Sequence, residues 1–564
     1  MQVKRRSRVV CLATVCAAIL TSSGAMGAAG EGKAYLQARP EEMRRWRAMK
    51  FGMFVCWGPV TLTGQEIGWS RGGERRGRKG RGKTPVEVYD TLYKRWKPKK
   101  FDARQWVQVA TDAGARYMIF LVKHHDGFCL YDTKLTDYKS TSREAAWRRD
   151  VMADVSAACR EAGLKLFVYY SQPDWHHPDY RTDTHARYIR YLHGQIRELL
   201  TNYGRIDGLW FDGLGGKAAD WDAEALFRMA RQIQPHLIIN NRCGLRGDFD
   251  TPEQRIGHFQ ADRPWESCIT LGTQWSWKPN DRIKSLKECV HILVRCTGGD
   301  GNLALNTNPM PDGRIEPRQA DRFRQIGGWL KRFGDSVYGT RGGPFRPGSW
   351  GASTYKGKTL YLHVLNWGGR ALVLPPIPKK VVASGLLTGG NACVKQNQEG
   401  VTITVAPEHR HPIDTIVRLE LDSPASGIPP CSLPSGSVVA GKKITASSVW
   451  PSPGYEPTRA IDDDPGTRWG AGANTRSGWL EVDLGKPTAI NRVEILEAYH
   501  RTRRFELQVK DGSEWRTCLR GTKIGERYSK QFSRVTARHV RLNILEATDV
   551  PTIWEFQLFP PGRQ

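Results

Sequence analysis

Short apolar runs alternate with amphipathic stretches between about residues 34 and 339. The runs have the length and composition of buried strands and comprise residues 51–57, 117–123, 164–170, 207–212 and 237–241. Between them, apolar positions recur at helical spacing over residues 103–113, 151–162, 185–202 and 223–232. This alternation predicts an α/β fold in which a parallel sheet closes into a (β/α)8-like barrel. A doubly wound sheet is the alternative, but no Gly-x-Gly-x-x-Gly follows the first strand.

The helical spacing disappears after residue 339. Residues 359–365 and 401–405 alternate as strands do, which predicts a small antiparallel β domain over residues 340–424. A Ser-, Pro- and Gly-rich linker is expected over 425–437. Residues 438–560 are again rich in short strands with regular turns, and we expect a C-terminal β-sandwich there.

The first 28 residues have the pattern of a Sec-type signal peptide. A basic stretch (Lys4, Arg5, Arg6, Arg8) precedes a short apolar run and a group of small residues around Ala28. Export makes genomic nucleic acid an unsuitable partner. No apolar run of about 18 residues follows, so no membrane span is expected after cleavage.

Charge and tryptophan content suggest two different classes of partner. The chain has 85 Lys and Arg against 57 Asp and Glu, a net charge of +28, together with 20 Trp. A basic protein suits anionic polymers or membranes, whereas indole faces suit sugar rings. Ten cysteines remain after the signal, without the spacing of a zinc site, and we expect buried thiols.

The residues at the predicted strand ends favour sugar. In a (β/α)8 barrel the active site lies at the carboxyl ends of the strands. Those ends carry aromatic, imidazole, guanidinium and carboxylate groups: Trp57, His124, His125, Tyr170, Trp210, Asp212 and Arg242. Such a set offers an apolar face for a pyranose, donors for its hydroxyls and an acid for chemistry. No Gly-rich phosphate loop is present.

Carboxylates at three positions are the catalytic candidates. Asp212 directly follows a buried apolar run, so it is either a nucleophile or the N-cap of the next helix. A glycosidase needs a second carboxylate as acid and base, and Glu253 and Glu266 are both suitable. The Trp that precedes Glu266 could raise its pKa by desolvation, as a general acid requires.

The paired histidines also have a metal interpretation. His124 with His125, and His176 with His177, supply four imidazoles. Neighbouring side chains on a strand point to opposite faces, and no carboxylate stands at metal-ligand spacing. Hydrogen bonding to sugar hydroxyls is therefore preferred, and no metal is expected in the catalytic site.

Several segments together resemble the α-L-fucosidases of glycoside hydrolase family 29. They run in order from about residue 35 to 345 and include FGMFVCWGPV, KHHDGFCLYDTKLTDYKS, YYSQPDWHHPDY, LWFDGLGG, NNRCGLRGDFDTPEQRIG and WESCITLGTQWSW. The resemblance implies a barrel fold and a retaining, cofactor-free removal of terminal α-L-fucose from glycans.

The resemblance also implies roles for individual residues. Asp212 matches the nucleophile, and the acid/base matches Glu253 in some members and Glu266 in others, with Glu253 slightly favoured by its Asp-Phe-x-Thr context. The implied sugar contacts are Trp57, Glu66, Trp69, His124, His125, Tyr170, Trp210, Arg242 and, more weakly, Trp277.

Cys56 departs from the family pattern, which has His at this position. A thiol is a weak donor and acceptor, so one contact with a fucose hydroxyl is expected to weaken. Either the pocket takes a modified or different sugar, such as an α-L-galactoside with the same mechanism, or activity on plain fucosides is lower. An alternative of another class is a catalytically inactive carbohydrate-binding protein, which would require a non-functional carboxylate pair.

The C-terminal segment resembles an F5/8 type C (discoidin, galactose-binding-like) domain. The resemblance rests on ITASS (444–448), AIDDD (460–464), TRW (467–469), GWLEVDLG (478–485) and IWEF (553–556). It implies a jelly roll, often with a structural Ca²⁺, that either binds sugar or only stabilises the protein.

A dense basic run lies near the expected barrel mouth. It comprises Arg71, Arg75, Arg76, Arg78, Lys79, Arg81 and Lys83, with only Glu74 against them. It is either a solvated loop or a rim that attracts anionic or sulfated glycans.

Overall fold

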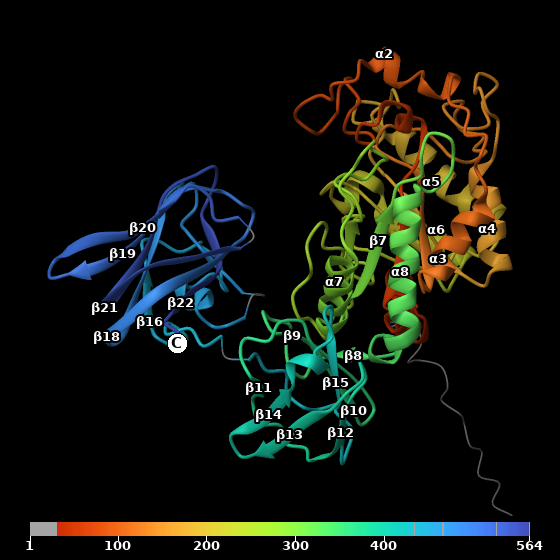
Figure 1. Ribbon diagram of the computed structural model, residues 1–564. Coiled ribbons are helices and arrows are strands. Elements are labelled where there is room, and N and C mark those ends of the chain that lie inside the picture. Colours follow the sequence, from red (N-terminus) through yellow and green to blue (C-terminus); the bar gives the residue numbers. More distant parts are fainter. Residues whose placement is uncertain (1–30, 434, 465–466, 526, 563–564) are drawn as a thin grey trace, which may run out of the picture.

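The computed structural model describes residues 31–433, 435–464, 467–525 and 527–562. It shows a barrel, a small middle β domain and a C-terminal β domain (Figure 1). The predicted signal peptide lies outside the described residues. Among the helices that are described, none combines the length and apolar character needed to cross a membrane.

The barrel is a parallel sheet of strand order β5-β4-β3-β2-β1-β7-β6. Its strands are β1 (Phe51–Val55), β2 (Tyr117–Lys123), β3 (Lys165–Tyr170), β4 (Gly208–Phe211), β5 (Ile238–Ile239), β6 (Glu266–Thr270) and β7 (Asn302–Thr307). Between the edges β5 and β6 lies the irregular segment 249–253, which makes single bridges to Asn240, Trp265 and Cys268. The predicted (β/α)8-like fold is therefore confirmed, with an irregular segment in place of an eighth regular strand.

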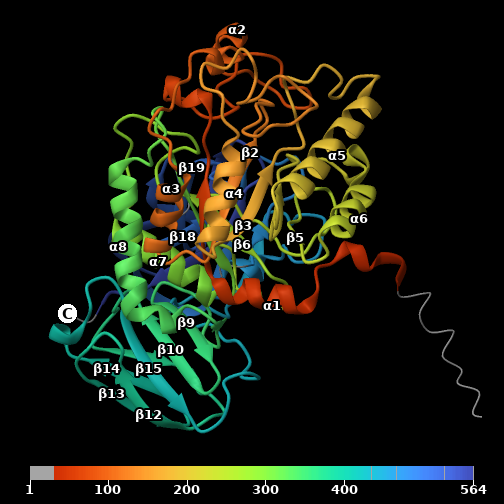
Figure 2. The same ribbon diagram turned by 90° about the vertical axis from the view of Figure 1, so that its right-hand side faces the viewer.

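Helices surround the sheet, and α1 (Pro40–Met49) lies at the end opposite α2 (Val86–Tyr89) (Figure 2). The others are α3 (Ala103–Asp112), α4 (Val151–Glu161), α5 (His185–Asn202), α6 (Ala223–Ile233), α7 (Leu286–Gly298) and α8 (Pro317–Phe333). Side-chain caps mark the starts of some of these helices. At α3, Asp102 accepts hydrogen bonds from the amides of Arg104 and Gln105. Ser285 and Glu288 form a capping box at α7.

The apolar pattern did not reveal β6 and β7. Both strands place polar side chains inside the barrel, including Glu266 and Asn302, so they lack the continuous apolar run of β1 or β2. Both strands are nevertheless fully buried in the structure, which their polar composition does not indicate.

Strand alternation decides which side chains enter the barrel. Along β3 and β4, Tyr169 and Trp210 point inward and stack with ring centroids 5.5 Å apart. Their neighbours Tyr170 and Phe211 belong to the layer between sheet and helices. Because Asp212 has the same parity as Trp210, the alternation carries its carboxylate to the barrel mouth.

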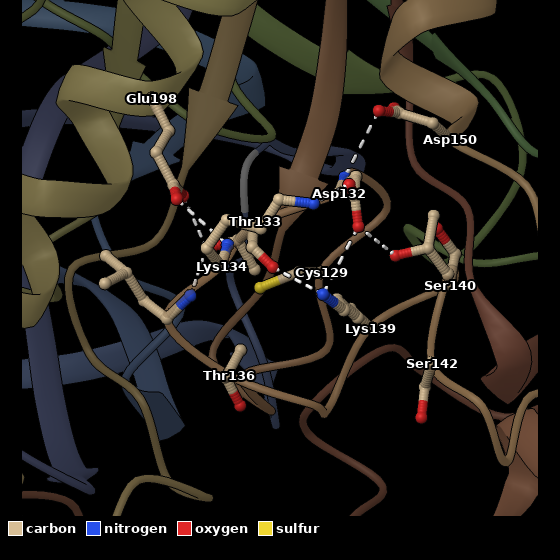
Figure 3. A network of polar contacts seen from close by, with 12 residues as sticks. Cys129, Asp132, Thr133, Lys134, Thr136, Lys139, Ser140, Ser142, Asp150 and Glu198 are labelled. Atoms are coloured by element: carbon tan, nitrogen blue, oxygen red, sulfur yellow. Dashed lines mark hydrogen bonds and ion pairs between the residues drawn. The ribbon is translucent and has the colours of Figure 1, made fainter.

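A polar network holds the loop that follows β2 (Figure 3). Asp132 accepts hydrogen bonds from Lys139 at 3.2 Å and Thr141 at 2.6 Å. Glu198 of α5 accepts from the Thr133 hydroxyl at 2.5 Å and the Lys134 amide at 2.9 Å. The loop that begins with the paired histidines is thus tied to a neighbouring helix.

The middle domain packs two antiparallel sheets around a buried apolar core. Their strands are β8 (Arg341–Gly342), β9 (Gly351–Lys356), β10 (Thr359–Val364), β11 (Ala371–Leu374), β12 (Val381–Leu386), β13 (Ala392–Asn397), β14 (Gly400–Val405) and β15 (Thr415–Leu421). Asp300 anchors this domain to the barrel, because its carboxylate binds Arg47 of α1 and Arg341 of β8.

The C-terminal domain is an antiparallel sandwich around a separate core. Its strands are β16 (Lys443–Ala446), β17 (Trp469–Gly470), β18 (Gly478–Glu497), β19 (Thr502–Asp511), β20 (Glu514–Gly521), β21 (Tyr528–Ala547) and β22 (Thr552–Phe559). Arg346 of the middle domain pairs with Asp464 of this one. All ten cysteines after the predicted signal are free, and seven are buried.

Candidate active site

A cavity of about 130 Å³ opens at the carboxyl ends of the barrel strands. It is lined by Phe54, Cys56, Trp69, Leu121, His124, His125, Tyr169, Trp210, Asp212, Leu214, Arg242, Glu253, Cys268 and Trp275. The structure therefore brings together eight of the thirteen residues predicted for the site.

Asp212 is held by three different side chains. The Tyr169 hydroxyl donates to Oδ2 at 2.9 Å, and Arg242 Nη1 donates to Oδ1 at 3.2 Å. His125 Nε2 lies 3.6 Å from Oδ2. Burial, reinforced by nearby Lys123 and Arg242, lowers the pKa of His125 well below its usual value. The imidazole is neutral, so this contact is not an ion pair.

Glu253 faces Asp212 across a shared guanidinium. Arg242 Nη1 also donates to Glu253 Oε2 at 2.8 Å. Since one nitrogen contacts both carboxylates, their two oxygens lie within about 6 Å of each other, below the ~6.5–9.5 Å separation of inverting glycosidases. Arg242 is itself fixed by the Thr251 hydroxyl and carbonyl at 2.7 and 2.9 Å. The shared nitrogen therefore holds the two carboxylates close together, as a retaining pair requires.

Glu266 lies beneath the cavity and does not line it. Its carboxylate accepts hydrogen bonds from Trp210 Nε1 at 3.1 Å and from the Tyr117 hydroxyl. Burial raises its pKa to about 7, as expected from the sequence, but for a different reason. Trp265 donates to the carbonyl of Gly299 and belongs to the other core layer, so the barrel interior itself causes the desolvation.

An aromatic wall closes one side of the cavity. Trp69 packs edge-on against His125 and Trp175, with centroids 5.6 and 5.2 Å away. Trp275 is positioned by Glu66, whose carboxylate accepts its amide at 3.0 Å. Glu66 therefore acts behind the wall and does not line the cavity.

Three predicted contacts lie elsewhere. Tyr170 points toward α5, where its hydroxyl donates to Gln195 at 2.7 Å, and Tyr169 lines the cavity instead. Trp57 is buried among other indoles and donates to the Met310 carbonyl at 3.0 Å. Trp277 is replaced in the lining by Trp275. Strand parity is the signal that could have found Tyr169, because it pairs in register with Trp210.

His124 is held in the cavity wall without a partner for its Nδ1 atom. Its ring stacks on Tyr169 at an angle of 9°. A Cβ at Gly68, where φ is +62°, would come within 2.4 Å of that nitrogen. Glycine is therefore required here, both for backbone conformation and for space.

Cys56 lines the cavity and is 3% exposed. Burial, and then the nearby Glu66 carboxylate, raise the pKa of its thiol well above the usual value. The group is a neutral thiol, smaller than an imidazole. As for metals, the described part of the chain has no group of three His, Cys, Asp or Glu side chains that could hold an ion.

The fold and the site geometry together define a class of protein. Two carboxylates close together in an aromatic pocket at the mouth of a (β/α)8-like barrel are typical of a retaining glycoside hydrolase. The family model for α-L-fucosidase matches residues 30–335, and the F5/8 type C model matches residues 443–556. The chain belongs to the α-L-fucosidase family, glycoside hydrolase family 29.

Known relatives agree with this membership. The human plasma α-L-fucosidase is 26% identical over 369 residues, covering 59% of this chain and 78% of that protein. Alpha-L-fucosidase 1 of Arabidopsis thaliana is 28% identical, covering 48% of this chain and 56% of its own length. The chain thus matches little more than half of the plant protein.

Solved structures of α-L-fucosidases align with about two thirds of this chain. The α-L-fucosidase isoenzyme 1 of Paenibacillus thiaminolyticus is 33% identical, with a TM-score of 0.62 over 68% of this chain and 99% of its own. A family 29 α-L-fucosidase of Bacteroides thetaiotaomicron, trapped as a covalent intermediate with 2-fluoro-fucosyl fluoride, has a TM-score of 0.61 at 25% identity. That intermediate indicates a retaining mechanism in the family.

Glu266 predicts a pH dependence of stability. Its pKa rises on folding from 4.5 to about 7, so its favourable contribution is present below pH 4.5 and is lost as the pH rises through 7. At 1.36 kcal/mol per pKa unit this amounts to about 3 kcal/mol. In urea unfolding at pH 4.5 and 8, Glu266→Gln should gain stability relative to wild type at the higher pH. Glu253→Gln is the matched control, and parallel pH curves for wild type and Glu266→Gln would refute the assignment.

Proposed function

We propose that this protein is an exported exo-glycosidase that releases terminal α-L-fucose from fucosylated glycans with retention of configuration. The observation that carries the proposal is the Arg242 nitrogen shared by Asp212 and Glu253. It keeps one oxygen of each carboxylate within about 6 Å of the other, which supports the close pair that double displacement needs. The basic and apolar pattern of residues 1–28 supports export.

In the first step, an Asp212 oxygen attacks the anomeric carbon of the fucosyl unit. Glu253, protonated, gives its proton to the glycosidic oxygen as the carbon–oxygen bond breaks and the alcohol leaves. The product is an ester between Asp212 and the sugar. Tyr169 and neutral His125 orient the nucleophile, since both contact Oδ2.

In the second step, water replaces the departed alcohol. The Glu253 carboxylate takes a proton from this water as its oxygen attacks the anomeric carbon, and the bond to Asp212 breaks. Asp212 returns as a carboxylate and Glu253 as an acid. Two inversions give net retention. Glu266 takes no part, because it contacts Trp210 and Tyr117 below the cavity.

Azide distinguishes the three carboxylates by the stereochemistry of its product. With 4-nitrophenyl α-L-fucoside, Asp212→Ala should lose activity, and added azide should yield the inverted fucosyl azide. Glu253→Ala should slow turnover by about 10²–10⁴-fold. Azide should then intercept the covalent intermediate and yield the retained product.

Glu266→Gln is the matched control in this experiment. It removes a carboxylate of the same barrel without opening a site for azide, so no azide product should form. Retained fucosyl azide from a Glu266 variant, and none from Glu253→Ala, would reverse the acid/base assignment. Full activity in Asp212→Ala would refute the nucleophile.

Cys56 favours a second candidate substrate. The small neutral thiol at this wall leaves space where the family pattern has an imidazole. An α-L-galactoside differs from an α-L-fucoside by one hydroxyl, which this space could accept under the same mechanism. The fucoside remains the preferred substrate, because the carboxylate pair and the family membership do not depend on Cys56.

Cys56→His should raise kcat/KM on the aryl fucoside. A restored hydrogen bond is worth about 1–2 kcal/mol, or roughly 5–30-fold. Cys56→Ala is the matched control, because it removes the thiol without adding a donor. Kinetics on paired aryl fucoside and aryl galactoside test both ideas. An unchanged or lower value on the fucoside, with a fall on the galactoside, would favour the galactoside enzyme.

For the C-terminal domain we propose a structural Ca²⁺. Glu555 is 1% exposed and its Oε1 atom has no hydrogen-bond partner. Burial, and then Asp462 and Asp463, raise its pKa to about 9. These three carboxylates alone do not form a metal-binding group, so backbone carbonyls would have to complete the oxygen ligands of a Ca²⁺ that offsets their negative charge. The ion would stabilise the loop after β16 and would not enter the catalytic steps.

Calorimetry of the full chain tests the calcium proposal. Millimolar Ca²⁺ should raise the Tm of the C-terminal transition, and EDTA should reverse the shift, because a ligand that binds only the folded state stabilises it by mass action. Asp462→Asn should reduce the shift, whereas the distant Asp511→Asn should not. A Tm that ignores Ca²⁺ would refute the site.

A further inference from the structure

The basic loop, residues 71–83, lies beside the active-site cavity. It follows Trp69 of the aromatic wall, and a bridge between Arg71 and Thr84 closes it. It precedes α2, at the end of the barrel opposite the middle domain (Figure 1). The sequence alone left open whether this loop is merely solvated or faces a ligand.

Part of its charge anchors the loop against the cavity rim. Arg71 forms two hydrogen bonds of 2.6 Å with Asp90. The Arg75 guanidinium lies 5.1 Å from the centre of the Trp69 ring and 5.4 Å from that of Trp175. Arg76 donates to three carbonyls of residues 177–180, the closest at 2.7 Å. These contacts fix the position of the loop.

Arg78 carries positive charge to the mouth of the cavity. It donates to the carbonyl of Leu214, a lining residue two positions after Asp212. Its effect extends inward, because Arg78 and Arg75 contribute to lowering the pKa of His125 after burial, Lys123 and Arg242. The loop therefore faces the side from which a glycan chain must leave the cavity.

The remaining charges of the loop are exposed and available. Lys79, Arg81 and Lys83 are exposed, as is Arg78. Across the part of the chain that the structure describes, none of the four forms an ion pair with a carboxylate. At its inner end the cavity is closed by the buried hydrogen bond between Trp210 and Glu266, so a bound glycan can extend only toward the mouth, where the loop lies.

We propose that the basic loop is a leaving-group subsite for an anionic sugar, one that carries a sulfate ester or a carboxylate next to the terminal fucose. This inference rests on the proposed fucosidase function and deepens it. Guanidinium groups bind such oxyanions through charge-assisted, paired hydrogen bonds, which are stronger than neutral ones. Exposed positive charge at the mouth also steers anionic substrates toward the cavity.

Matched disaccharides test the subsite. The substrates are a fucosyl-galactose, the same compound with a sulfate ester on the galactose, and a fucosyl-galacturonic acid. At 20 mM NaCl we expect kcat/KM to be about tenfold higher for an anionic substrate than for the neutral one. At 300 mM NaCl this ratio should fall toward one, because salt screens exposed charges. The sulfate and carboxylate arms identify which anion the loop prefers.

Two charge-matched variants locate the effect. Lys79→Gln/Arg81→Gln/Lys83→Gln leaves the anchoring arginines in place and should bring the anionic-to-neutral ratio close to one. Lys395→Gln/Lys442→Gln/Lys443→Gln removes the same charge from the middle and C-terminal domains and should preserve the ratio. A ratio near one in wild type at both salts, or an equal fall in both variants, would overturn the proposal.

Failure of the fucosidase function would give a different result. In that case no fucoside, neutral or anionic, would be cleaved by wild type. Calorimetric binding of the sulfated disaccharide to the same variants at 20 mM NaCl would then test the subsite alone. Tighter binding to wild type than to the loop variant supports the subsite, whereas equal binding overturns it.

Discussion

One guanidinium holds the catalytic geometry together. Arg242 binds Asp212 and Glu253 through a single nitrogen, and Thr251 and the Trp210 ring hold it in turn. In the proposed mechanism only one of the two carboxylates is ionised at a time: Asp212 before attack and Glu253 in the covalent intermediate. The cation therefore faces one negative charge throughout, and the charge moves while the arginine stays still.

Most of the barrel strands, and the candidate residues at their ends, could be predicted because the spacing of apolar residues and the end of each apolar run can be read from the local sequence. β1 to β5 and helices α3 to α6 follow from apolar spacing. Which of two adjacent tyrosines enters the barrel could not be predicted, since Tyr169 and Tyr170 have the same chemistry and differ only in parity relative to β4. The same limit applied to Glu266, whose depth depends on the register of β6 with β7.

The floor of the cavity shows how burial can imitate function. Glu266 has the raised pKa expected of a general acid, yet its carboxylate accepts hydrogen bonds from Tyr117 and Trp210 inside the barrel and does not line the cavity. Its environment is that of a core residue that positions the Trp210 indole, which lines the cavity. A perturbed carboxyl in a barrel thus needs an open path to the substrate before chemistry is assigned to it.

Glu253 stands on the irregular segment that fills the gap between β5 and β6. This segment is held by isolated bridges, not by a continuous ladder, so its length is not tied to the barrel's shear. Insertions or deletions there can shift Glu253, the proposed general acid, along the chain while Asp212, the proposed nucleophile, keeps its place at the end of β4. Counting residues from Asp212 is therefore a poor way to locate the corresponding glutamate in another chain. Superposing structures on the arginine that joins the two carboxylates will find it.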